Sequence, residues 1–330
     1  MERRTRAGVL LAVAALCLTG TVAFLLGGRV EHHRTAFPVM GTVAAMTFYT
    51  GPEAFAQAVE AVKTEFELVS RAANVHDEKS ELSRLNATAA EKPFACSPEL
   101  WELLTESRRA YRLSEGAFDI SVKPLMDLWG FYRKRSKIPS EEEIAKTRAL
   151  TGLDKVIFDD ARRTVKFSKP GMALDLGGIA KGYALERAAK AVIARGITRG
   201  VVDLGGNLRL LPETPPGQEC YRIGIRRPAR KNGGVMPEIL RLGGNCSVAS
   251  SGDYERYIKL EGRFYGHIMD PATGIPAPGV RAVTAVAPEG TLSDWLSTAV
   301  YLRGEALAEK LKQALPGTDF IIIPKEKEKE

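Results

Sequence analysis

The chain has 330 residues, of which 45% are hydrophobic and 26% are charged. This composition is sufficient for a buried core and excludes a chain that is disordered throughout. The formal net charge is +7, but five arginines and two glutamates in residues 1–34 contribute +3 of it and leave +4 for the rest. So small an excess of positive charge in the remaining 296 residues argues against nucleic acid as a partner.

An apolar segment stands at the N-terminus. Arginines at positions 3, 4 and 6 precede residues 7–28, which carry no charge, and a helix of that length would span about 33 Å, enough for a bilayer core. The arginines would stay in the cytoplasm, so the rest would be exported to the periplasmic side of the inner membrane. The segment is either a cleaved signal peptide or an uncleaved signal anchor. We therefore expect this segment and a linker in residues 1–34, one folded domain in residues 35–322 and a charged tail in residues 323–330.

The first half of the chain alternates predicted strands and helices. Residues 42–50 alternate like a strand, and residues 52–73 have apolar side chains at helical spacing. Ser97, followed by Pro98 and Glu99, is typical of a helix start, and we expect this helix to end near Gly116. An acidic helix is expected near residues 140–149, with short strands at 155–160, 164–168 and 171–176.

The second half mixes hairpins with helices. We expect a strand, a glycine turn and a strand over residues 199–211, a hairpin that turns at Glu261 and Gly262, a long helix at 291–315 and a last strand at 319–324. This order predicts an α+β fold with mixed or antiparallel sheets and packed helices. The pattern Asp-Leu-Gly-Gly ends two apolar stretches, at 173–178 and at 201–206, which suggests an internal duplication.

Residues 173–186 read ALDLGGIAKGYALE and place Gly177 and Gly178 directly before an amphipathic helix. Free N–H groups and the helix dipole favour an anion there, and Lys181 adds a positive charge. A turn in which the glycines let a strand and a helix pack closely explains the pattern equally well, because neither GxxxxGK[ST] nor GxGxxG is present. Asp175 suits an anion site only if it binds a sugar or base or helps to organise a cation.

Candidate ligands for a cation lie downstream. Asp294, Ser297 and Thr298 stand at positions i, i+3 and i+4 of a predicted helix, so their oxygens share one side of it. Such oxygen ligands suit Mg²⁺, although Ser293 or Asp294 acting as a helix cap is the simpler explanation. A further candidate is His267, which precedes a predicted turn and would accept a proton from a hydroxyl at neutral pH unless its role is structural.

Taken together and in order, these stretches resemble the ApbE family of FAD:protein FMN transferases, over about residues 39–302. The matching motifs are MGT at 40–42, SELSRLN at 80–86, SEGAFDISVKPLMDLWGF at 114–131, DLGGIAKGYALE at 175–186, DLGGN at 203–207, HIMDPATG at 267–274 and SDWLSTAV at 293–300.

The resemblance implies an enzyme that uses Mg²⁺ to transfer FMN from FAD to a threonine or serine of an exported or membrane redox protein, with release of AMP. It implies that Met40, Ala117, Phe118 and Asp119 hold the flavin nucleotide, that Asp175 binds its adenosine side, that Lys181 faces it and that Ile268 lines the pocket. It also implies Mg²⁺ ligation by the Gly178 carbonyl, Asp294 and Thr298 with Ser297 nearby, and His267 as the general base.

Two residues depart from the family pattern. His76 falls where many members have an aromatic residue, usually tyrosine, and Trp295 stands where a small residue is commoner. Two other functions stay open at this point. One is an FAD pyrophosphatase that releases FMN and AMP through the same metal site, and the other is a non-catalytic flavin-binding protein attached to the membrane.

Overall fold

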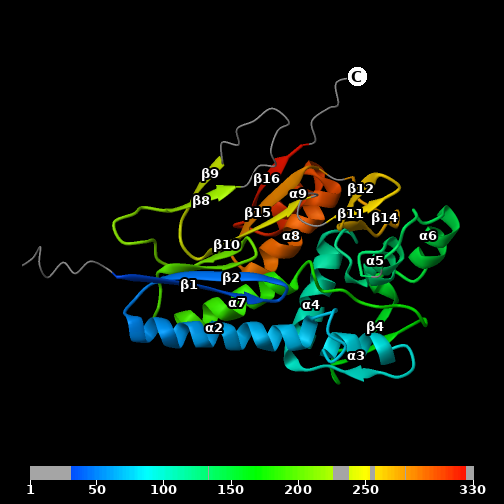
Figure 1. Ribbon diagram of the computed structural model, residues 1–330, viewed down its shortest axis with the longest axis horizontal. Coiled ribbons are helices and arrows are strands. Elements are labelled where there is room, and N and C mark those ends of the chain that lie inside the picture. The colour runs from blue at the N-terminus through cyan, green and yellow to red at the C-terminus, as the bar shows by residue number, and fades with distance from the viewer. Residues whose placement is uncertain (1–30, 133, 226–237, 253–256, 279, 325–330) are drawn as a thin grey trace, which may run out of the picture.

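The computed structural model describes residues 31–132, 134–225, 238–252, 257–278 and 280–324. The predicted N-terminal membrane segment and most of the charged tail lie outside these residues. Among the helices that the structure describes, none combines the length and the apolar character needed to cross a membrane. Figure 1 shows a sheet backed by helices, with smaller sheets and short helices at one end.

The described residues form one seven-stranded sheet in which every neighbouring pair is antiparallel. Its order is β1 (His32–Val39), β2 (Thr42–Tyr49), β6 (Gly200–Leu204), β7 (Asn207–Leu210), β10 (Cys246–Gly252), β15 (Ala282–Ala287) and β16 (Asp319–Ile323). The predicted α+β class with antiparallel sheets is therefore confirmed. Residues 32–34, expected in the linker, belong to β1.

Four small sheets surround this one. They are β3 (Phe94–Ala95) with β5 (Thr164–Phe167) and β4 (Val156–Asp159), β8 (Tyr221–Ile225) with β9 (Glu238–Leu242), β11 (Tyr257–Leu260) with β12 (Arg263–Gly266), and β13 (Met269–Asp270) with β14 (Ile275–Pro276). The hairpin turn at Glu261 and Gly262 is confirmed, and both residues have positive φ, as a tight two-residue hairpin turn requires.

The helices are α2 (Pro52–Ala73), α3 (Glu81–Thr88), α4 (Pro98–Leu113), α5 (Lys123–Trp129), α6 (Glu141–Arg148), α7 (Ala180–Ile193), α8 (Gly290–Arg303) and α9 (Glu305–Ala314), with 3₁₀ turns at Ile120–Val122 and Leu153–Lys155. The predicted cap at Ser97 is confirmed, because its hydroxyl accepts a hydrogen bond from Leu100 N. At the start of α6, Ser140 forms a complete capping box with Glu143.

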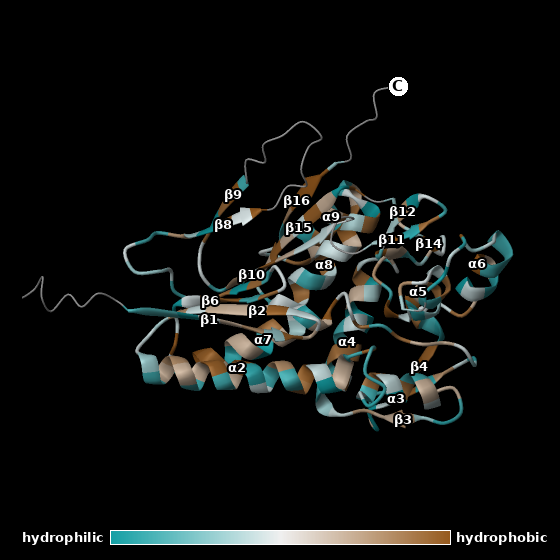
Figure 2. Ribbon diagram, viewed as in Figure 1, coloured by the Kyte–Doolittle hydropathy of each residue, from teal (hydrophilic) through white to brown (hydrophobic). Residues whose placement is uncertain are grey.

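Two hydrophobic clusters hold the molecule together. The larger lies between the sheet and α2, α7 and α8, where α2 packs along α7 and exposes its polar residues (Figure 2). The smaller gathers Leu125, Met126, Trp129, Phe131, Leu260 and Met269, from α5, β11 and β13 and the segment after α5. The β11–β12 hairpin therefore packs on this smaller cluster rather than on the large one.

Three predictions about the elements are wrong. The helix expected at 291–315 is two helices, because the chain breaks at Gly304 with φ 67° and ψ −152°. Residues 171–176 form no strand, since Leu174 N and O bond to the Asn86 side chain and Asp175 N donates to Ile120 O. The first Asp-Leu-Gly-Gly therefore leads from a loop into α7, whereas the second ends β6, and the repeat marks no duplicated substructure.

Helices α7 and α8 cross at two glycines. A Cβ on Gly182 would lie 2.2 Å from Gly290 O, and one on Gly290 would lie 2.4 Å from Gly182 O. Each helix also supplies a carboxylate to the start of the other: Gly182 N donates to Asp294 Oδ2 at 2.8 Å, and Gly290 N donates to Glu186 Oε2 at 3.0 Å. Each carboxylate lies four residues after the glycine of its own helix, so the crossing is nearly two-fold symmetric.

We expect Gly290→Ala to lower the free energy of unfolding by about 3 kcal/mol or more, because the added methyl group meets main-chain atoms that cannot move independently. Urea unfolding measures this change. The control is Gly243→Ala, at a glycine of ordinary φ with no atom within 4 Å of the added Cβ. Equal stability of the two variants would contradict the close crossing.

Candidate active site

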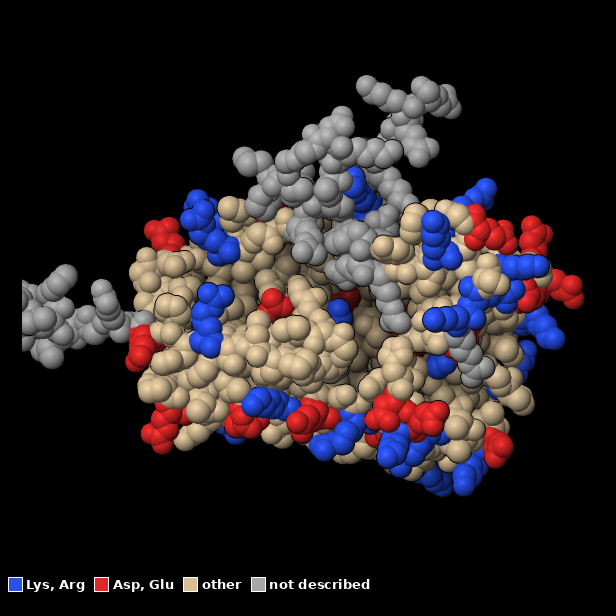
Figure 3. All heavy atoms as spheres, viewed as in Figure 1, with Lys and Arg blue, Asp and Glu red and all other residues tan. Residues whose placement is uncertain are grey.

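Several of the predicted site residues come from separate segments that meet near the starts of α7 and α8. The face of the molecule shown in Figure 3 is hollowed between the β1–β2 hairpin and the part that carries β11 and β12, and both acidic and basic side chains lie in the hollow. The turn that follows β6 lies against the start of β2, because Gly205 N donates to Val43 O at 3.0 Å.

Asp294 is the central polar residue of this region. It is 5% exposed, and its two oxygens accept hydrogen bonds from Gly182 N at 2.8 Å and from Asn207 Nδ2 at 2.9 Å. Burial raises the pKa of the Asp294 carboxyl, while the charge of Lys181 and these two hydrogen bonds oppose the rise. The helix cap considered for Ser293 or Asp294 is excluded, because α8 already begins at Gly290.

A second carboxylate shares the influence of Lys181. Burial raises the pKa of Asp203, and a hydrogen bond from Gly206 N and the charge of Lys181 act in the opposite direction. Lys181 itself stands in the first turn of α7. The region therefore holds one ammonium group between two partly or fully desolvated carboxylates, and an added cation would relieve the excess of negative charge.

Hydroxyl groups continue the polar surface along α8. Ser251 Oγ, at the end of β10, lies 2.8 Å from Ser297 Oγ and 3.2 Å from Thr298 Oγ1. Gly178 reaches the same place, since a Cβ there would lie 3.6 Å from Thr298 Oγ1 and 3.0 Å from the Phe118 ring. The structure thus brings Gly178, Asp294, Ser297 and Thr298 together.

Asp175 is fixed beside this group by its neighbours. Its Oδ1 accepts from Gly177 N at 2.8 Å, and the Tyr132 hydroxyl bonds to its Oδ2. The His76 ring meets Tyr132 edge to face at 5.0 Å. His76, which departs from the family pattern, therefore supports the tyrosine that holds Asp175.

The Ala117–Asp119 segment divides between two places. Ala117 and Phe118 are buried in the large cluster, and the Phe118 ring lies 6.2 Å from that of Trp295. Trp295 is fully buried and fills core, although no described group pairs with its Nε1. The Asp119 carboxylate instead accepts from Ser121 N at 2.8 Å and lines a separate cavity of about 500 Å³ with Tyr111. The Asp119 carboxylate is thus already engaged. The main chain of Asp119, next to Phe118, is the part of this residue that remains for the expected contact with a nucleotide.

Met40 occupies the turn between β1 and β2. It has φ 50° and is followed by Gly41 at φ 71°, the signs that a tight hairpin turn imposes at both positions. A non-glycine residue held at positive φ costs energy and is found most often at functional positions. Its side chain packs partly against the large cluster.

His267 lies between β12 and β13 and is half-buried. The next residue, Ile268, is 7% exposed and belongs to the large cluster, and Ile268 O accepts from Ala277 N at 2.8 Å. The predicted turn after the histidine is confirmed, because Gly274 N donates to Asp270 O at 2.8 Å. His267 is therefore placed at the junction of the two clusters.

Several residues that position this site have no role in the sequence analysis. They are Asn86, Tyr132, Asp203, Asn207 and Ser251. Asn86 and Asn207 end the motifs SELSRLN and DLGGN, so their place in these motifs is the signal that the sequence offers for them. Tyr132 and Ser251 carried none, because their partners are distant in the chain.

The donor set suits a hard cation that keeps part of its hydration. No group of three His, Cys, Asp or Glu side chains capable of holding a metal occurs in the part of the chain that the structure describes. One buried carboxylate, hydroxyls and a main-chain carbonyl are instead the partial ligand set that Mg²⁺ accepts when substrate phosphate completes it. The residues present therefore fit Mg²⁺ better than zinc.

Comparison with known proteins gives consistent matches. The model of the ApbE family matches residues 40–322. An FAD:protein FMN transferase of Haemophilus influenzae is 30% identical over 76% of this chain and 73% of its own length, and one of Vibrio cholerae is 34% identical over 68% and 67%. The solved structure of the flavin transferase ApbE from Vibrio cholerae superposes with a TM-score of 0.79 at 30% identity, covering 90% of this chain and 94% of its own. An ApbE protein from Thermotoga maritima gives 0.79 at 31% identity, covering 89% and 94%.

Removing the Asn207 amide should weaken the fold in a pH-dependent way. In metal-free protein, Asn207→Ala takes a hydrogen bond from a buried carboxylate and raises the pKa of Asp294 further. A raised folded-state pKa costs stability as pH rises, so the loss should approach about 2 kcal/mol near neutral pH and shrink where Asp294 is protonated. Urea unfolding across pH with EDTA tests this. A loss that is the same at every pH would contradict it.

Proposed function

We propose how this chain, which belongs to the ApbE family and is an FAD:protein FMN transferase, carries out its reaction: with Mg²⁺ it transfers FMN from FAD to a hydroxyl group of the acceptor protein. The observation that carries the proposal is the convergence of the Asp294 carboxylate with Gly178 and Thr298 at the start of α7. A protein that only stored flavin would need no such cation site beside a helix N-terminus.

Mg²⁺ would be held by the Gly178 carbonyl, Asp294 and Thr298, with Ser297 and Ser251 holding the threonine hydroxyl in place. When bound, the metal supplies charge stabilisation for the pyrophosphate oxygens under attack. Support comes from the buried Asp294 carboxyl, because burial raises its pKa and a bound cation would stabilise the ionised form. Gly182 N and Asn207 orient that carboxylate and leave lone pairs on both oxygens.

The nucleotide would lie across the start of α7. Main-chain N–H groups there and Lys181 suit its phosphates, and Met40 and the Ala117–Asp119 segment would hold the flavin part. Asp175, fixed by Tyr132 and Gly177, would bind the adenosine side, with Ile268 in the pocket lining. This arrangement accounts for an acidic residue next to a phosphate site.

His267 would act as the general base. The hydroxyl oxygen of the acceptor bonds to the phosphorus of the FMN half of FAD, its proton passes to an imidazole nitrogen, and the bond between the two phosphates breaks so that AMP leaves with the electron pair. Water as the nucleophile would instead give FMN and AMP, which is the pyrophosphatase reaction.

The acceptor would be a threonine or serine of an exported or membrane redox protein, a subunit of a membrane redox complex. The basic and apolar N-terminal segment supports a location on the periplasmic side of the inner membrane, either anchored or released. Residues 35–322 would form the transferase domain, with the charged tail after it.

Intact-mass measurement tests the reaction. The full chain is incubated with FAD, MgCl₂ and an exported redox subunit purified without flavin, and we expect the subunit to gain one FMN, with no gain in EDTA. Release of FMN and AMP into solution without any gain in mass would identify a pyrophosphatase, and intact bound FAD would identify a carrier.

Asp294→Asn should remove Mg²⁺ binding with little loss of fold. With FAD present, MgCl₂ should raise the Tm of the wild type and leave that of the variant unchanged. As the pH falls, the rise in Tm that MgCl₂ causes in the wild type should disappear before the pH reaches about 4, where an ordinary aspartate titrates. The reason is that the pKa of Asp294 is raised. Glu289→Gln, an exposed carboxylate just before α8, is the control and should behave like the wild type. A full Mg²⁺ effect in Asp294→Asn would refute the assignment.

His267→Ala should lower the rate of FMN transfer by roughly 10²- to 10⁴-fold while slow hydrolysis of FAD continues, because water is its own proton acceptor. The two rates are measured by the mass of the acceptor protein and by AMP release. His32→Ala, an exposed histidine in β1, is the control. An equal loss of transfer and hydrolysis would exclude a role as base toward the acceptor.

A further inference from the structure

Exposed apolar side chains lie close to His267 in the chain. Six large hydrophobic residues are exposed among those that the structure describes, namely Val43, Ile157, Ile239, Tyr257, Phe264 and Ile275. Three of them, Tyr257, Phe264 and Ile275, lie within ten residues of His267, on the hairpins before and after it. Single exposed apolar residues are ordinary, but a cluster beside a site is typical of a binding surface.

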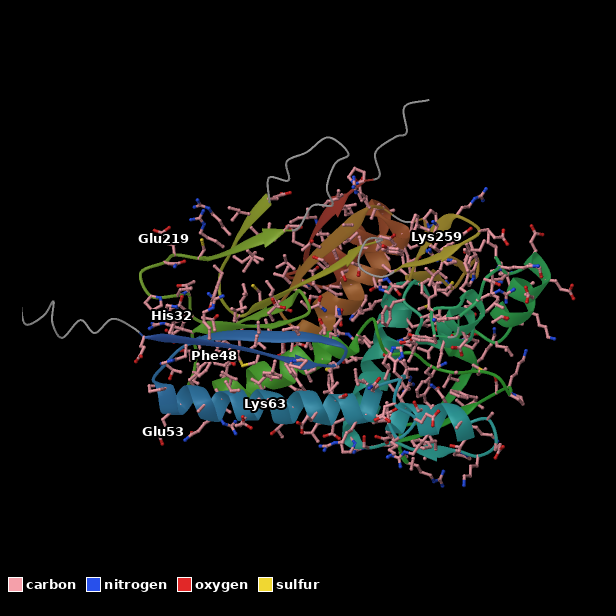
Figure 4. The ribbon with its side chains drawn as sticks, in the orientation of Figure 1. His32, Phe48, Glu53, Lys63, Glu219 and Lys259 are labelled. Carbon is pink, nitrogen blue, oxygen red and sulfur yellow. The ribbon has the colours of Figure 1, made fainter. Side chains whose placement is uncertain are left out.

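Tyr257 and Phe264 form a preorganised aromatic pair. Their rings meet edge to face at 5.2 Å, and they are 56% and 64% exposed. Lys259 Nζ lies 5.4 Å from the centre of the Phe264 ring, and Figure 4 shows Lys259 on the hairpin at the end of the molecule opposite the N-terminal strand. We call Tyr257, Lys259 and Phe264 the aromatic patch.

Packing of the hairpin does not require this patch. Alternate residues point to opposite faces of a strand, and Ile258, Leu260 and Tyr265 face the smaller cluster, where the Tyr265 ring lies 5.0 Å from that of Trp129. The hairpin is therefore anchored by one face, and its other face carries two large rings that contribute little to folding.

The patch adjoins the proposed base. Tyr257 is the cross-strand partner of Gly266, the residue before His267. Phe264 precedes His267 by three residues, which is about 10 Å of extended chain. A molecule that touches the patch therefore lies within a few residues of the atom that would accept the proton.

We propose that the aromatic patch is the docking surface for the acceptor protein, which lays an apolar side chain near its reactive hydroxyl against Tyr257 and Phe264. This inference rests on the proposed function, since only a macromolecular substrate needs a surface outside the nucleotide site. The exposed Lys259, the cross-strand partner of Phe264 on the same face, favours an acceptor segment with an acidic residue beside the apolar one. Aromatic side chains are well suited to such anchoring because they bury much area with few rotatable bonds.

The test is the double variant Tyr257→Ser/Phe264→Ser of the full chain. We expect the KM for the flavin-free redox subunit to rise about tenfold or more, while the affinity for FAD and the slow release of AMP without acceptor stay at wild-type values. Ile157→Ser, an equally exposed apolar residue on β4, is the matched control and should leave all three quantities unchanged.

The outcomes separate the two proposals. If the wild type transfers no FMN to the subunit, the proposed function fails and the docking surface fails with it. If the wild type transfers FMN and the double variant keeps the same KM, only the docking surface is refuted. A variant that loses FAD affinity in parallel with acceptor affinity would show that the rings support the fold of the site, which also refutes docking.

Discussion

The crossing of α7 and α8 is the constraint on which the site depends. Two glycines let the helix backbones touch, and each helix start receives a carboxylate from the other helix. Glu186 also accepts a hydrogen bond from Nε of the buried Arg209 at 2.9 Å, so its negative charge is paired with a guanidinium group. Among the residues that the structure describes, Asp294, the matching residue, accepts from Gly182 N and Asn207 Nδ2 and from no arginine, and its cationic neighbour is Lys181. The two carboxylates of the crossing therefore differ in their positive partners, and Asp294 is the one beside which we place the phosphates of the nucleotide and their metal.

Local signals in the sequence were sufficient for most elements. Pro52, Ser97 and Ser140 mark helix starts that the structure reproduces, and Glu261-Gly262 marks the hairpin, because caps and tight turns are decided by residues next to one another. The break at Gly304 was missed since apolar spacing continues across it. Residues 171–176 have the apolar pattern of a strand, but Leu174 bonds to the side chain of Asn86, which lies 88 residues away in the chain.

The sequence names candidate site residues, but it does not say how they are arranged in space. Helical spacing places Asp294, Ser297 and Thr298 on one side of a helix, yet nothing in that spacing says that they face Gly178 and Ser251. Asp119 shows the converse, because its carboxylate is used by Ser121 N. The sequence does not reveal a role for Asn207 or Tyr132, because each of them bonds to a carboxylate that another segment of the chain contributes.

The junction of the two hydrophobic clusters has a consequence for how the enzyme can change. Ile268 is anchored in the large cluster and Met269 in the small one, so the chain passes from one to the other directly after His267. The residues that we propose to bind the metal stand next to members of the large cluster in the chain, whereas the proposed docking hairpin is packed on the small one. If both proposals hold, substitutions in the smaller cluster would change which acceptor protein is bound while the residues that bind FAD and its metal stay the same.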